Sequence, residues 1–131
     1  MALFLLISSA CDDSTLDVKR DTILGRWNWQ QSSGGLAGII NTPESVGYSI
    51  ELEFNENGIY TLYVADTIQE QGNYNITKEL SVFSNDPVPT ITYENRSIPQ
   101  AILKLNKDSL LVADECLDCF LEAFIRISDG E

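Results

Sequence analysis

Short apolar runs separated by turn residues fill the chain from Ile23 onward, and this pattern predicts strands rather than helices. The clearest run is residues 48–54, where apolar and polar positions alternate strictly. Asn57-Gly58 follows it and supplies the positive φ of a tight hairpin turn. No segment shows convincing helical periodicity, and no internal repeat is visible. The other strands are expected at residues 25–31, 59–64, 72–77, 80–84, 90–93, 102–106, 110–113 and 120–127.

A meander of eight or nine antiparallel strands must either close on itself or protect two edges. Closure into an up-and-down barrel is the natural solution for this number of strands. Pro87, Pro89 and Pro99 are expected in loops or at strand edges, because proline cannot donate a hydrogen bond to a neighbouring strand. The pattern therefore predicts an all-β fold over residues 22–131, an antiparallel barrel of eight to nine strands.

The N-terminus is apolar and then small up to Ala10, and Cys11 follows. This is the form of a signal peptide's apolar segment and cleavage site. A cysteine at the cut resembles the lipobox of bacterial lipoproteins, in which the thiol is diacylated. The run is too short to span a membrane, which needs about 20 apolar residues. We expect a signal peptide at residues 1–10, then lipidated Cys11 and a disordered, flexible tether over residues 11–21.

Two features depart from the usual lipobox. Ser8 stands where Leu is common, and no Lys or Arg precedes Cys11. A natural start farther upstream would explain both the short signal and its missing charge. The alternative is a frayed apolar N-terminus with a chance cysteine. The Asp12-Asp13 pair resembles a surface-export signal in some Gram-negative groups and an inner-membrane retention signal in others, so the membrane face stays open.

Charge and composition exclude several functions. The chain has 20 Asp and Glu against 8 Lys and Arg, and this excess of negative charge disfavours nucleic acid as a partner. It has no histidine, which removes Ser-His-Asp and Cys-His catalysis and most zinc sites. Asp114, Glu115 and Asp118 share a turn, but their spacing matches no calcium loop. We expect no catalytic residues, no metal and no cofactor.

Cys116 and Cys119 remain once Cys11 is assigned to lipid. An oxidising envelope favours a disulfide between them, although a bridge across so tight a turn strains its geometry. Free thiols and a redox pair are the alternatives. A redox pair needs its first cysteine at a helix N-terminus, whereas both flanks of this turn have the pattern of strands.

Gly25-Arg26-Trp27, at the start of the first strand, resembles the Gly-x-Trp signature of lipocalin and calycin barrels. Arg126, in the last strand, stands where those barrels place an arginine over the indole to close one end by cation–π contact. The longest connection, residues 32–47, corresponds to the loop that covers their open end. The resemblance implies that Gly25, Trp27 and Arg126 close the barrel.

Three further stretches resemble small lipocalin-like lipoproteins of Gram-negative bacteria. They are Trp27-x-Trp29 with Ser33-Gly34-Gly35, then Thr42-Pro43-Glu44-Ser45-x-Gly47-Tyr48, and finally Cys116-x-Asp118. The resemblance implies a lipoprotein of the cell envelope, attached by its N-terminal lipid and placed at the outer membrane.

Such a barrel binds a small apolar or amphipathic ligand if it encloses a cavity. The residues expected there are Trp29, Leu36, Ile39, Ile40, Tyr48 and Tyr60. Each also has a plainer interpretation, as core packing for the tryptophan, a cross-strand pair for the tyrosines, or a core plug for the loop residues. The alternative function is that of an accessory lipoprotein with a filled barrel, which binds an envelope protein partner.

Overall fold

The computed structural model describes residues 23–128. The expected signal peptide, the lipidation at Cys11 and the tether therefore lie outside the described residues. The strands are β1 (Gly25–Gly34), β2 (Ile39–Asn41), β3 (Ile50–Phe54), β4 (Ile59–Val64), β5 (Thr67–Ser81), β6 (Ser84–Tyr93), β7 (Gln100–Leu105), β8 (Ser109–Asp114) and β9 (Phe120–Ser128), with a short helix α2 (Pro43–Val46).

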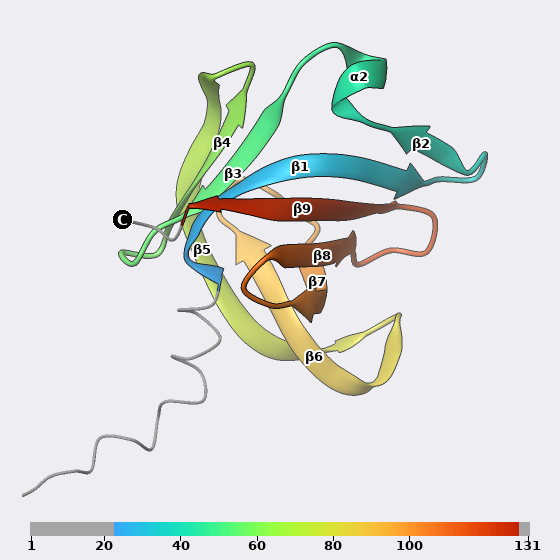
Figure 1. Ribbon diagram of the computed structural model, residues 1–131. Helices are drawn as coiled ribbons and strands as arrows, with labels where there is room; N and C mark the ends of the chain where they lie inside the picture. Colours follow the sequence, from blue (N-terminus) through green and yellow to red (C-terminus); the bar gives the residue numbers. More distant parts are fainter. Residues whose placement is uncertain (1–22, 129–131) are drawn as a thin grey trace, which may run out of the picture.

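The strands form one antiparallel sheet that closes on itself (Figure 1). Its order is β2-β1-β3-β4-β5-β6-β7-β8-β9, and β1 pairs with β9 as well. Because β2 pairs only with the end of β1, the other eight strands form the closed barrel. The predicted all-β, up-and-down barrel is confirmed.

One end of the barrel is closed around Trp27. The Arg126 guanidinium carbon lies 4.2 Å from the centre of the Trp27 ring, within the range of a cation–π contact. Arg126 Nη1 also donates a hydrogen bond to the Leu24 carbonyl at 2.6 Å, and Trp27 Nε1 donates to the Ile23 carbonyl at 2.8 Å. Gly25 enters β1 with a φ of 122°, a backbone conformation that favours glycine.

Alternation along the strands fills the interior with large side chains. Trp27 and Trp29 point to the same side of β1 because side chains of a strand alternate between its faces. Two aromatic rings from other strands meet edge to face, Tyr60 with Tyr93 at 4.8 Å between centroids. The largest of the fully buried side chains are Ile23, Trp27, Phe54, Tyr60, Thr90, Ile91, Leu110 and Val112.

The β5–β6 hairpin is longer than the sequence pattern indicated. Separate strands were expected at residues 72–77, 80–84 and 90–93, whereas β5 and β6 run without a break to a tight turn. Pro87 and Pro89 lie inside β6. Proline is tolerated there because β7 pairs with β6 only at Thr90 and Ile91, which leaves the preceding residues on a free edge.

A helix that the periodicity did not predict follows β2. Thr42 and Ser45 form a reciprocal capping box, and Pro43 occupies the first turn. The helix is a single turn with no buried residue, so it has no apolar face whose spacing could reveal it. The capping residues were the available signal.

Candidate functional site

A cavity of about 260 Å³ lies inside the barrel, farther along β1 than Trp27 and toward the end from which the β1–β2 hairpin projects. Its lining comes from β1, β3, β4, β9 and the β6–β7 loop, namely Trp29, Ser32, Ile50, Leu52, Leu62, Arg96, Glu122 and Phe124. A second, more open hollow of about 280 Å³ adjoins it and shares Arg96 and Glu122. The two hollows form the candidate site.

One wall of the cavity is apolar and set by strand register. Trp29 pairs directly with Phe124 across β1 and β9, and both side chains are 4% exposed. Leu52 pairs with Leu62 across β3 and β4. Opposed residues of neighbouring strands share a face, so each pair presents a continuous apolar surface. This wall suits the ring or chain of an apolar ligand.

The other wall is polar and centres on Glu122 of β9. Trp29 Nε1 donates to Ser32 Oγ at 2.9 Å, and Ser32 Oγ donates to Glu122 Oε2 at 3.3 Å. Gln100 Nε2 donates to the other carboxylate oxygen, Oε1, at 3.2 Å. The carboxylate is therefore held in place by neutral donors, one on each oxygen.

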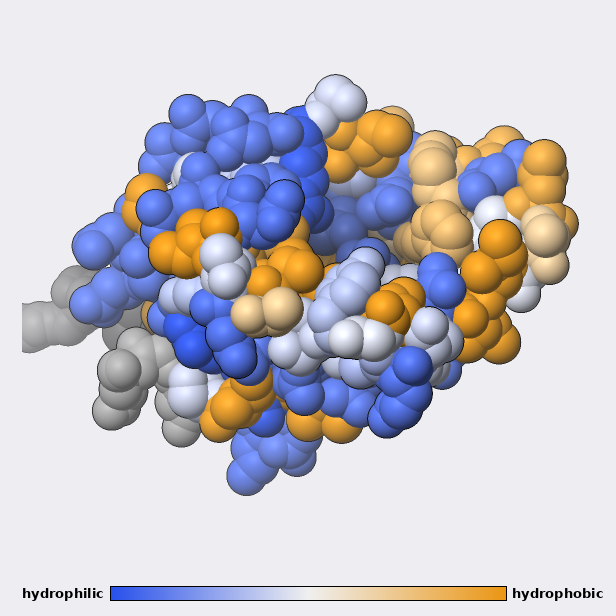
Figure 2. Space-filling view, turned by 90° about the horizontal axis from the view of Figure 1, so that it is seen from above, coloured by the Kyte–Doolittle hydropathy of each residue, from blue (hydrophilic) through white to orange (hydrophobic). Residues whose placement is uncertain are grey.

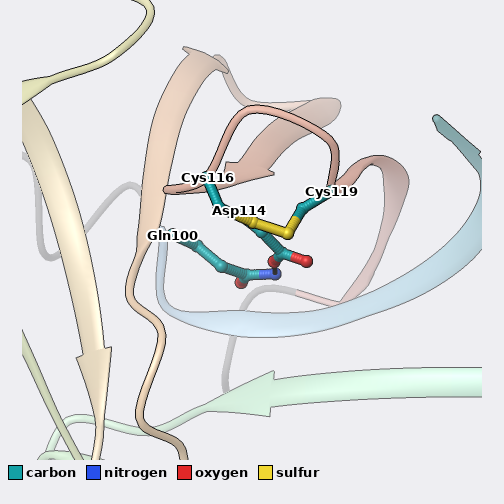
Figure 3. The surroundings of a disulfide bond; sticks show 4 residues. All are labelled: Gln100, Asp114, Cys116 and Cys119. Carbon is teal, nitrogen blue, oxygen red and sulfur yellow. Dashed lines mark hydrogen bonds between the residues drawn. A yellow bond between two sulfur atoms is a disulfide. The ribbon is translucent and has the colours of Figure 1, made fainter. Parts of the chain in front are cut away.

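Gln100 connects this carboxylate to a second one. Its amide nitrogen also donates to Asp114 Oδ1 at 3.0 Å, and its amide oxygen accepts from the Tyr93 hydroxyl at 2.7 Å. Figure 3 shows Gln100 and Asp114 beside the Cys116–Cys119 disulfide, which closes the turn after β8. The predicted disulfide is confirmed, with its two Cα atoms 5.6 Å apart.

Arg96, from the β6–β7 loop, is the cation of the site. Its Nε donates to Glu70 Oε2 at 3.0 Å, and its guanidinium carbon lies 4.3 Å from the centre of the Tyr93 ring. Glu70 also accepts a hydrogen bond from the Tyr60 hydroxyl. Glu70 thus offsets the charge of Arg96.

Burial raises the pKa of Glu122 above that of an ordinary glutamate, and the nearby Asp114 carboxylate raises it further. Gln100, Arg96 and Ser32 act in the opposite direction but do not cancel this shift. The ionised form of Glu122 is therefore less favourable in the folded chain than in the unfolded chain.

We expect Glu122→Gln to raise the free energy of unfolding above that of the wild type at pH 7.5, and to raise it less, or not at all, at pH 4. The pKa of Glu122 is raised on folding, so ionisation lowers stability as pH rises from the unfolded value of about 4.3. Glutamine cannot ionise and avoids this loss. Urea unfolding of both proteins at the two pH values measures the difference. An effect of equal size at both pH values would contradict the prediction, because it would mean that ionisation of Glu122 does not lower the stability of the fold.

The structure brings only part of the expected ligand-binding set to the cavity. Trp29 lines it, as described above. Tyr60 is fully buried in the core and is absent from the cavity lining. Leu36, Ile39, Ile40 and Tyr48 are exposed by 90%, 49%, 60% and 44%, and none of them lines either hollow.

The reason lies in the β1–β2 hairpin. β1 continues to Gly34 and pairs with β2 there, so the connection expected to cover the barrel projects beyond it instead (Figure 1). Figure 2 shows apolar side chains gathered at the tip of this hairpin, at the right of the view. The loop is neither a lid on the cavity nor a plug in the core.

The polar residues of the site were not predicted from the sequence. The sequence did contain a signal for Glu122. It lies two residues from both Phe120 and Phe124, so its side chain points to the same face of the strand as theirs. Gln100 begins a strand whose next two residues are buried, and it is itself 2% exposed. Arg96 lies in a loop, where no alternation could place it.

Across residues 23–128, no group of three or more Cys, Asp or Glu side chains is arranged to hold a metal ion. In the same range, no helix has both the length and the apolar character needed to cross a membrane.

The closed eight-stranded barrel, the Arg126–Trp27 contact at one end and the cavity toward the other are consistent with a lipocalin-like, calycin-type fold. No protein-family model, curated protein or solved structure matches this chain.

Proposed function

We propose that this protein is a non-enzymatic, lipid-anchored envelope lipoprotein whose barrel binds a small apolar or amphipathic ligand. The cavity of about 260 Å³ carries the proposal, since it combines the Trp29–Phe124 wall with the polar group at Glu122. An apolar cavity of about 150 Å³ is enough to bind benzene, whereas most small-molecule sites have volumes of about 300 Å³ or more. A ligand of one or two rings fits this range.

The anchor part of the proposal rests on the sequence around Cys11. The described chain begins at Ile23, whose carbonyl accepts the hydrogen bond from Trp27 at the closed end. A tether attached there would leave the cavity end of the barrel directed away from the point of attachment. This arrangement suits a binding protein that is held at the outer membrane.

The exposed tip of the β1–β2 hairpin favours a second candidate, an accessory lipoprotein that binds a protein partner. Leu36, Ile39 and Ile40 lie close together in the chain and are all exposed. Groups of exposed apolar side chains are typical of protein interaction sites. This candidate does not need the cavity to be occupied.

Native mass spectrometry of the full chain, purified from a Gram-negative envelope, tests ligand binding. We expect an additional mass that leaves on denaturation, and we expect Leu62→Trp to lose it by filling the cavity. A wild-type chain without any mass that leaves on denaturation would contradict ligand binding and favour the accessory function. Leu103→Trp, at an exposed position outside the cavity lining, is the control for an added indole.

Membrane fractionation tests the anchor. The wild-type chain should stay in the membrane fraction and carry a diacylglycerol mass on the peptide that contains Cys11. Cys11→Ala should release a folded protein into the soluble fraction. Retention of Cys11→Ala in the membrane would contradict a lipid anchor.

A further inference from the structure

We propose that the cavity selects ligands with a positively charged amine attached to a small apolar group. This inference rests on the proposed ligand-binding function and names the chemical class of the ligand. It starts from the charged side chains around the two hollows, where neither Glu122 nor Asp114 forms an ion pair within residues 23–128.

Glu122 lines the cavity and has no ion pair within the described part of the chain. The ion pairs there are Arg26–Glu51, Arg26–Glu53 and Arg96–Glu70. Both oxygens of Glu122 accept hydrogen bonds from neutral groups, as described above, and each oxygen keeps a second lone pair for another donor. An ammonium group has three donors and would supply both a hydrogen bond and the missing charge.

The other charges at this end of the barrel favour a cation over an anion. Arg96 is the only cation lining the two hollows, and Glu70 is bound to its Nε. Asp114 adds a carboxylate, joined to Glu122 through the Gln100 amide. The four charged groups sum to two negative charges when all are ionised, so an anionic ligand would enter a repulsive site.

The apolar wall fits the remainder of such a ligand. Glu122 follows Phe120 and precedes Phe124 on the inward face of β9, which places its carboxylate beside the Phe124 ring of the cavity lining. Trp29 faces Phe124 across the strands, and aromatic faces attract organic cations. An amine at Glu122 would thus place an attached ring or chain against Trp29, Phe124 and Leu52.

Binding of an amine should strengthen as pH rises. The charged and titratable groups that face Glu122 are Asp114 on β8, Arg96 on the β6–β7 loop and Tyr93 on β6, and burial raises the pKa of Glu122 above its ordinary value. The ionised form of Glu122 attracts the ammonium group more strongly than the neutral acid does, so acid conditions weaken binding. An alkyl amine, like that of lysine, stays protonated from pH 4 to pH 7.5.

Three probes of matched shape separate charge from fit: 2-phenylethylamine, 2-phenylethanol and phenylacetate. Each is titrated at pH 7.5 into the ¹⁵N-labelled full chain in detergent and followed by NMR. The indole N–H of Trp29 reports the cavity because it donates to Ser32. The indole N–H of Trp27 is the internal control, because it lies at the closed end and donates to Ile23.

We expect the amine to shift the Trp29 indole and to bind at least about tenfold more tightly than the alcohol. Glu122→Gln should reduce amine affinity to about that of the alcohol, and an unchanged Trp27 indole signal shows that the variant is folded. Glu44→Gln, which makes the same change of charge on the exposed helix α2, should leave amine binding unchanged.

Equal binding of the amine and the alcohol would overturn the inference and leave the proposed ligand-binding function intact. Tightest binding of phenylacetate would also overturn it and would assign the polar contact to Arg96. If no probe shifts the Trp29 indole, the inference fails, and native mass spectrometry decides the proposed ligand-binding function separately. An equal loss of amine binding in Glu44→Gln and Glu122→Gln would reduce the effect to overall charge and overturn the inference.

Discussion

We expect Trp27→Ala to lower the free energy of unfolding by about 3–5 kcal/mol, the range for truncating a large buried aromatic side chain. Trp27 is fully buried, and its indole both donates to the Ile23 carbonyl and receives the Arg126 guanidinium on its face. Alanine leaves a cavity at the closed end and removes both contacts. Urea unfolding with an unchanged m value measures the loss.

Trp27→Phe is the matched variant, because it keeps a ring beneath Arg126 but removes the indole hydrogen bond. Its loss should be clearly smaller than that of Trp27→Ala. A loss well under about 1 kcal/mol for Trp27→Ala would show that the closed end does not depend on this residue.

Gly34→Ala should destabilise the protein by about 3 kcal/mol or more, because it combines backbone strain with a steric clash. Gly34 ends β1 opposite Phe120 of β9, with a φ of 143°. A Cβ at this position would lie 2.4 Å from the Cys119 backbone oxygen. The backbone beside the disulfide must therefore shift, and the last β1–β9 pairs separate.

Gly38→Ala separates the two effects. Gly38 has a φ of 64°, but no atom lies within 4 Å of an added Cβ, so its loss should stay at about 1–2 kcal/mol. Thermal unfolding of both variants under oxidising conditions gives the comparison. Equal losses would mean that close contact with Cys119 contributes nothing.

Glu122 connects stability with the proposed binding function. A buried carboxylate without a cation destabilises the folded protein, yet it is the group that we expect to recognise an amine. Glu122→Gln should therefore raise stability at pH 7.5 and weaken amine binding. Opposite effects of one substitution on stability and binding are common in sites that are built for a ligand.

The fold class follows from local patterns. Alternation of apolar and polar residues over 48–54 and the Asn57-Gly58 turn indicate a hairpin, and residues 50–54 and 59–64 form it. The same alternation places Trp27 and Trp29 inside. These features could be predicted because the direction of a side chain depends only on its parity within its own strand.

Strand length and loop position needed the tertiary structure. Pro87 and Pro89 ordinarily end a strand, but β6 accommodates them because β7 leaves its edge free there. Leu36, Ile39 and Ile40 suggested a covering loop, whereas pairing of β1 with β2 carries them beyond the barrel. Neither outcome is encoded locally, since each depends on which neighbour a strand pairs with.

The sequence by itself determined the all-β class, the inward tryptophans and the favoured Cys116–Cys119 bridge. The tertiary structure alone decided the candidate site, because Ser32, Gln100 and Glu122 come from strands far apart in the chain. Barrel closure and register bring these polar side chains together, and Arg96 reaches them from a loop. Alternation along a strand predicts that a polar side chain points inward, but only the closed barrel shows which other side chains it contacts.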